Sequence, residues 1–118
     1  MPSSEQRVRH FQAELEQLKA RLLEMGGLAE EQVRLAVKGL VDRDRDLIAR
    51  VLIGDGPLNS LQIEVDNRCF TLLALYQPMA VDLRAIVAAV KINTDLERVG
   101  DLAINIAEGH ASTSSTRR

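Results

Sequence analysis

Few of the residues that build special sites are present in this sequence. Its 118 residues include no tryptophan, one tyrosine and two phenylalanines, so the core has to be built from aliphatic side chains, which suits packed helices. A single cysteine excludes an internal disulfide and a cysteine-based zinc site, and it favours a reducing compartment. The two histidines, His10 and His110, lie near the ends, and no GxSxG, Walker or HExxH motif occurs. A conventional catalytic centre is therefore not expected.

Charge and hydropathy exclude two further classes of protein. Fifteen lysines and arginines against seventeen acidic residues give a net charge of -2, without the basic excess that nucleic-acid binding requires. No apolar run approaches the roughly 18 residues of a membrane span, and the N-terminal residues lack the apolar core of a signal peptide. We expect a one-domain cytoplasmic protein that neither binds nucleic acid nor inserts into a membrane.

The first half of the chain predicts two long amphipathic helices. From Phe11 to Leu40, apolar or small residues recur at steps of three and four, with charged residues on the other side. Residues 42–46 are all charged, which predicts a turn with candidate N-caps for the next helix. That second helix is expected over residues 47–76, with a kink or a break at Pro57, because proline lacks the N–H that the helix needs there.

The third helix is expected to begin with Pro78 in its first turn and to end near Gly109, a suitable residue for a C-terminal cap. Its apolar residues keep the same spacing as far as Ile106. Residues 110–118 have no apolar pattern and are expected to be a disordered polar tail. The predicted fold is all-α, an elongated antiparallel three-helix bundle over residues 5–109, with helices about 45 Å long.

Two pairs of oxygen-bearing side chains are the strongest candidates for a site. Glu97 and Asp101 are four residues apart and project from one side of the third helix. If the hairpin turns at Pro78, residues at equal distances from it lie side by side, which places Asn59 and Asp55 opposite that pair. Oxygen donors without imidazole or thiolate suit iron, manganese or magnesium rather than zinc or copper. The alternative is a set of solvated surface carboxylates.

Two motifs resemble a known family. Gln-Pro-x-Ala-x-Asp-Leu-Arg occupies residues 77–84, and Leu-Glu-Arg-x-Gly-Asp occupies residues 96–101. Together with the Ile-Gly-Asp of residues 53–55 and the apolar spacing of the first helix, they resemble PhoU, the phosphate-uptake regulator family of bacteria. The resemblance covers residues 7–108.

The resemblance implies a three-helix bundle with surface metal clusters held by acidic pairs. In this sequence the pairs fall on Asp55 and Asn59 and on Glu97 and Asp101. It also implies a cytoplasmic negative regulator of the phosphate regulon. Such a protein is an adaptor, not an enzyme, and links the ATPase subunit of the phosphate ABC transporter to a sensor histidine kinase.

The sequence departs from the family in one respect that affects its partners. Members of the family usually carry two such bundles in tandem, whereas this chain resembles the N-terminal bundle alone. Its apolar faces are wide, so we expect self-association as a homodimer. Residues 78–84 are either a simple turn or a docking end for a partner. Two alternatives stay open: a metal-dependent hydrolase or oxidase using the carboxylate cluster, and a truncated fragment without a signalling function.

Overall fold

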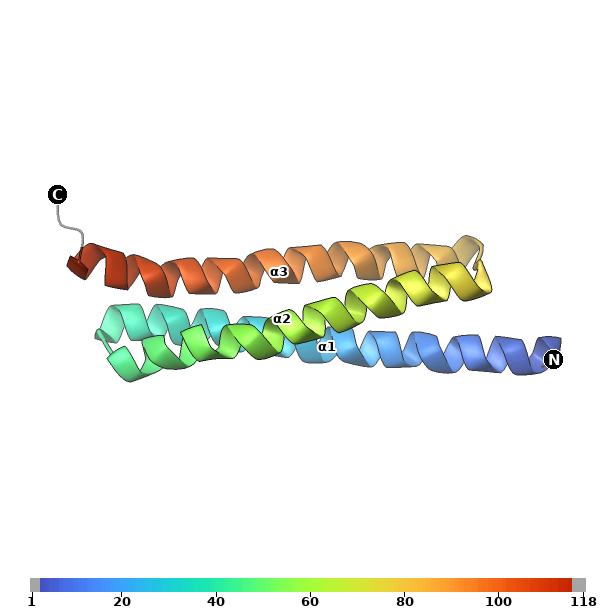
Figure 1. Cartoon of the computed structure of the whole chain (residues 1–118), viewed down its shortest axis with the longest axis horizontal. Helices are drawn as coiled ribbons and strands as arrows, with labels where there is room; N and C mark the ends of the chain where they lie inside the picture. Colours follow the sequence, from blue (N-terminus) through green and yellow to red (C-terminus); the bar gives the residue numbers. More distant parts are fainter. Residues whose placement is uncertain (1–2, 116–118) are drawn as a thin grey trace.

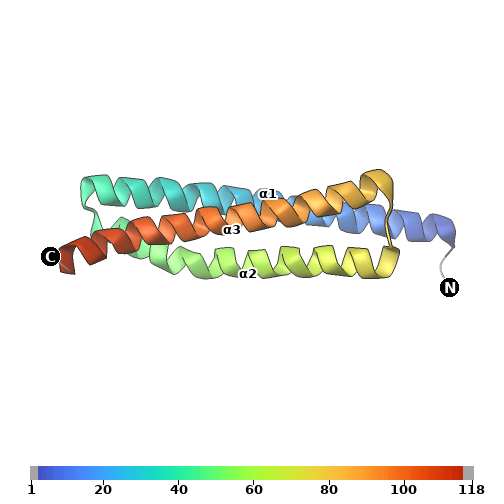
Figure 2. The same ribbon diagram turned by 90° about the horizontal axis from the view of Figure 1, so that it is seen from above.

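The computed structural model describes residues 3–115, with side chains described over residues 3–109. It consists of α1 (Ser4–Asp42), α2 (Arg45–Tyr76) and α3 (Ala80–Ser115), and the described residues form no strand. Figures 1 and 2 show the three helices side by side along a rod, with α1 and α3 running in the same direction and α2 in the opposite one. The rod measures 64 × 23 × 19 Å. The predicted all-α three-helix bundle is confirmed.

The connection between α1 and α2 is short. Arg43 adopts a left-handed backbone conformation, with φ of 55°, and ends α1. Asp44 caps α2, since its side chain accepts hydrogen bonds from the main-chain amides of Asp46 and Leu47. Two of the orphan amides at the start of the helix are satisfied in this way. The turn predicted within residues 42–46 is confirmed.

Helix α2 continues through Pro57, so the break considered at this position does not occur. Pro57 cannot donate to the carbonyl oxygen four residues earlier. However, Val51 is fully buried and Leu58 is 3% exposed, so the turns on both sides of the proline are held against the core. Gly56, which precedes the proline, has no Cβ to clash with the ring. Packing on both sides therefore keeps one helix.

The connection between α2 and α3 differs in one detail from the prediction. Gln77 has a φ of 47° and ends α2, and Ala80 has a φ of 54° at the start of α3. Pro78 lies between these two left-handed residues, in the connection and not in the first turn of α3. The main-chain amide of Asp82 donates to the carbonyl oxygen of Met79 at 3.2 Å, which closes the first turn without the proline.

Helix α3 does not end at Gly109 but continues to Ser115. No glycine of the described residues has a positive φ, so Gly109 keeps a helical backbone and does not form the expected cap. A glycine inside a helix costs only about 1 kcal/mol relative to alanine, which is not enough to stop it. Residues 110–115 of the expected tail are thus helical in their backbone, and residues 116–118 lie outside the described residues.

The core divides into two clusters along the rod and follows the predicted apolar spacing in part: Leu40, expected in the apolar stripe of the first helix, is 41% exposed, whereas the polar Gln32 and Asn93 are buried. The smaller cluster lies toward the α1–α2 connection, and its buried residues include Ile48 and Ala103. The larger one fills the rest of the bundle and includes the buried Cys69. None of the helices, over the residues that the structure describes, is long and apolar enough to cross a membrane. The buried residues of the larger cluster are Phe11, Leu15, Leu18, Met25, Ala29, Leu58, Leu61, Val65, Cys69, Leu72, Ile86 and Ala89.

Candidate functional site

Two close contacts define how α3 lies against α2 in its middle. The side-chain amide of Asn93, which is 2% exposed, donates to the carbonyl oxygen of Gln62 at 3.1 Å. Gly100 meets Leu58, because a Cβ built on Gly100 would be 2.6 Å from a Leu58 methyl carbon. The absence of a side chain at Gly100 therefore lets α3 approach α2 closely.

These contacts place the predicted oxygen donors at the same level of the bundle. Glu97 lies between Asn93 and Gly100 on α3, and Asn59 follows Leu58 directly on α2. Asp55 and Glu97 are half-buried, whereas Asn59 and Asp101 are exposed. The side-chain amide of Asn59 donates to the carboxylate of Asp55 at 3.4 Å. Each pair flanks the line along which α2 and α3 meet.

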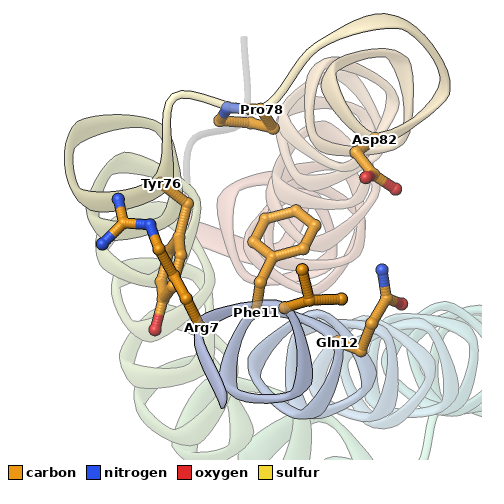
Figure 3. Close-up of a pocket in the computed structure, with 7 residues that line it drawn as sticks. Arg7, Phe11, Gln12, Tyr76, Pro78 and Asp82 are labelled. Carbon is orange, nitrogen blue, oxygen red and sulfur yellow. The ribbon is translucent and has the colours of Figure 1, made fainter. Parts of the chain in front are cut away.

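A small pocket lies at the opposite end of α2, beside the connection to α3. It has a volume of about 170 Å³, and most of its wall is apolar. Figure 3 shows Phe11 between Arg7 and Tyr76 on one side and Gln12 and Asp82 on the other. The pocket is lined by Arg7, Val8, Phe11, Gln12, Tyr76, Pro78 and Asp82.

Contacts between α1 and α2 hold one wall of this pocket in place. The ring centres of Phe11 and Tyr76 are 5.3 Å apart and the rings are tilted by 58°. The guanidinium carbon of Arg7 is 5.1 Å from the Tyr76 ring centre, within the range of a cation–π contact. Arg7 also donates to the carbonyl oxygen of Leu75. The pocket is therefore lined by a cation that these contacts hold in place, Arg7, and by an acidic residue, Asp82, beside a mostly apolar wall.

Comparison with known proteins identifies the family of this chain. The model of the PhoU domain matches residues 22–109. The chain belongs to the PhoU family. It is 46% identical over 105 residues to the phosphate-specific transport system accessory protein PhoU homolog of Caulobacter vibrioides, covering 89% of this chain and 46% of that protein.

Two further relatives are named phosphate-specific transport system accessory protein PhoU. The accessory protein PhoU of Edwardsiella tarda is 41% identical over 96 residues, and that of Escherichia coli is 38% identical over 96 residues. Each alignment covers 81% of this chain and 40% of the relative. The chain thus spans less than half the length of these curated relatives.

The oxygen donors of this PhoU domain are aligned along one seam but are not gathered around a point. No three His, Cys, Asp or Glu side chains within the described part of the chain are close enough to hold a metal ion. Asp55 is engaged with Asn59 of its own helix. The metal site therefore stays a prediction.

Sequence reasoning did not find the whole pocket at the end of this PhoU domain. Residues 78–84 were considered as a docking end, and Pro78 and Asp82 of that segment do line the pocket. Arg7 and Phe11 were not connected with Tyr76, because they lie on a different helix and far away in the sequence. The matched PhoU-domain region begins after both of them, at residue 22.

Proposed function

We propose that this chain acts in the cytoplasm as a regulatory accessory of phosphate uptake, as an adaptor between the ATPase subunit of the phosphate ABC transporter and a sensor histidine kinase. The proposal is supported by an alignment that covers 81–89% of the chain and relates it to proteins named as accessories of the phosphate-specific transport system. In such a role the protein works by contact with other proteins and not by turnover.

Deletion of the gene tests this function. In phosphate-rich medium, cells without the chain are expected to express a reporter of phosphate starvation, because the kinase is no longer repressed. The wild-type gene should restore repression. A reporter that stays silent after the deletion would contradict the proposal, and it would favour the alternative of a fragment without a signalling function.

The pocket lined by Phe11 and Tyr76 is a candidate contact point for one of these partners. Val8 lines it and is 59% exposed, so a charge introduced there changes the apolar wall without touching the core. The Val8→Asp variant is expected to fold normally but to restore repression poorly. Lys91→Asp, an exposed change on α3 away from the pocket, is the control and should behave as wild type.

We also propose that the pairs Asp55 and Asn59, and Glu97 and Asp101, bind iron or manganese, with magnesium as an alternative. The support is the chemistry of the donors, which are oxygen atoms, and their position on both sides of one seam. Bound metal would join α2 to α3, because each helix supplies one pair. Its role would be structural or regulatory.

Elemental analysis after loading with iron or manganese and washing tests the metal site. The double variant Glu97→Ala/Asp101→Ala should lose the metal and stay helical, whereas Asp95→Ala, an exposed acidic neighbour on the same helix, should retain it. Equal metal content in all three proteins would contradict the site. Turnover of a phosphoester or peroxide that disappears in Glu97→Ala would favour the hydrolase or oxidase alternative.

The chain is further proposed to form a homodimer. The support is that large apolar side chains stay exposed on every helix, among them Leu23 on α1, Phe70 on α2 and Leu102 on α3. Sedimentation at micromolar concentration should show a dimer. A monomer throughout that range would contradict this part of the proposal.

A further inference from the structure

The outward side of α1 carries a second regular stripe, which the bundle itself does not bury. Its members follow one another at alternating steps of four and three residues, the spacing of a coiled-coil seam. All of them are exposed, with Leu23 at 79% and Val41 at 73%. The outer stripe consists of Leu23, Gly27, Glu30, Arg34, Val37 and Val41.

The outer stripe can pair with a second copy of itself that runs in the opposite direction, because apolar residues then face apolar residues and glutamate faces arginine. If a second copy of α1 runs antiparallel with its centre near residue 32, Leu23 faces Val41 and Glu30 faces Arg34. Each of these pairings occurs twice because of the two-fold symmetry of such a dimer. Apolar residues then meet at both ends of the seam, and opposite charges meet in the middle.

Gly27 is the member of the stripe that the single bundle does not explain. A glycine inside a helix costs about 1 kcal/mol relative to alanine. A Cβ built on Gly27 would have nothing within 4 Å, so no neighbour in the bundle needs the space. In the antiparallel pairing Gly27 faces Val37, whose branched side chain would fill that space. The glycine thereby allows two copies of α1 to approach closely.

The surroundings of the stripe suit the same partner. Beside it, between α1 and α3, lies an open and mostly apolar groove of about 480 Å³, to which Val33 and Val99 contribute. Arg34 forms an ion pair with Glu31 of its own helix at 2.8 Å, yet its side chain stays 59% exposed. The guanidinium group therefore has donors left for a carboxylate from another chain.

We propose that the outer stripe of α1 is the dimer interface, with two copies of the chain packed antiparallel about residue 32. The inference rests on the proposed self-association and assigns it to one face and one register. Glu30 and Arg34 select the antiparallel arrangement, because a parallel pair would place like residues of the stripe opposite each other.

Disulfide trapping distinguishes the register directly. In a Cys69→Ala background, chains carrying Leu23→Cys are mixed with chains carrying Val41→Cys and oxidised. The mixture should give a covalent dimer. Either variant alone should not, because its two cysteines would be about 27 Å apart along the antiparallel pair, at 1.5 Å of rise per residue. Cross-linking of each variant with itself, without a mixed product, would overturn the antiparallel register.

Charge reversal tests the centre of the seam. Glu30→Arg places arginine opposite arginine and Arg34→Glu places glutamate opposite glutamate, so each variant should dimerise about tenfold more weakly or worse. An equimolar mixture of the two should recover wild-type dimerisation, since every pair is again of opposite charge. Lys91→Glu, away from the stripe, is the control.

The outcomes separate this interface from self-association in general. If the wild-type chain is a monomer, both proposals fail. If it is a dimer but neither the cysteine mixture nor the charge reversals respond, self-association stands and the outer stripe is not its interface.

Discussion

The side-chain amide of Gln32 in α1 donates a hydrogen bond to the main-chain carbonyl oxygen of Val51 in α2, with an Nε2 to oxygen distance of 2.7 Å. Gln32 is only 6% exposed, and its side chain occupies the space that Gly54 leaves empty on α2. A Cβ on Gly54 would collide with the side-chain oxygen of Gln32. The glycine and the buried amide therefore depend on each other.

Because of this dependence, Gly54→Ala should change the free energy of unfolding in opposite directions in the wild-type chain and in a Gln32→Ala background. Gly54→Ala in the wild-type chain should lower the free energy of unfolding by about 1 kcal/mol, because the buried hydrogen bond is lost while helix propensity improves. In a Gln32→Ala background the collision is absent, and the same substitution should raise the free energy of unfolding by about 1 kcal/mol. Urea unfolding of the four proteins checks this. Equal effects in both backgrounds would contradict the coupling.

Gly100 and Gly26 are expected to respond in opposite ways to alanine. Gly100→Ala pushes a methyl group into Leu58 at a buried contact between α2 and α3, and it should destabilise the bundle by about 1–3 kcal/mol. Gly26→Ala meets no atom within 4 Å and should stabilise α1 by up to about 1 kcal/mol. Thermal unfolding followed by circular dichroism measures both. A stable Gly100→Ala variant would mean that α3 can shift away from α2 without cost.

Pro57 is expected to weaken α2 in the native protein. Its replacement by alanine returns an N–H to position 57, which can donate to the carbonyl oxygen of Ile53, and relieves the crowding by the proline ring. Pro57→Ala should therefore raise the free energy of unfolding, by up to about 3 kcal/mol. Chemical denaturation is the measurement. A lower stability would show that the proline sets a helix direction on which the core depends.

The buried thiol of Cys69 is expected to make the stability of the protein depend on pH in the alkaline range. Burial, and to a lesser extent the nearby Asp66, raises the pKa of the Cys69 thiol to about 11 from its usual value near 9. The unfolded chain then loses this proton at lower pH than the folded one, so the contribution of Cys69 to stability is complete below pH 9 and is lost between pH 9 and 11.

The comparison with a Cys69→Ala variant isolates this contribution. The stability of the wild type should fall more steeply with pH across that window than the stability of the variant. The native thiol should also react slowly with a disulfide reagent at pH 8 and quickly after unfolding. Identical pH slopes in the two proteins would contradict the assignment.

The arrangement of helices could be predicted from the sequence because apolar spacing is the dominant signal in a bundle. The helix end expected at Gly109 was wrong, and of the kink or break expected at Pro57 the break does not occur, because at both positions a local penalty was given more weight than packing. Pro57 and Gly109 each disfavour a helix locally, by about 3 and 1 kcal/mol, and yet α2 and α3 continue through them. Side chains buried on both sides of Pro57 decide the outcome there, and single-position propensities contain no information about them.

Counting residues from the hairpin predicts that Asp55 and Asn59 lie at the level of Glu97 and Asp101, since helices of equal rise keep their register. The register itself is seen in the neighbouring contacts of Asn93 with Gln62 and of Gly100 with Leu58. The orientation of the side chains of the two pairs could not be obtained by counting residues. The pocket at Tyr76 was harder still, because its cation, Arg7, comes from the start of α1 and carries no signal in the local sequence.

The rod shape has a consequence for how much of this protein meets its surroundings. Its solvent-accessible surface is 7978 Å², whereas a compact monomer of 13.1 kDa is expected to expose about 6,400 Å². The surplus is about a quarter of that value, or about twice the roughly 800 Å² that one protein contributes to a standard interface. Partners can therefore cover the long sides of this bundle and leave it no more exposed than an ordinary globular protein.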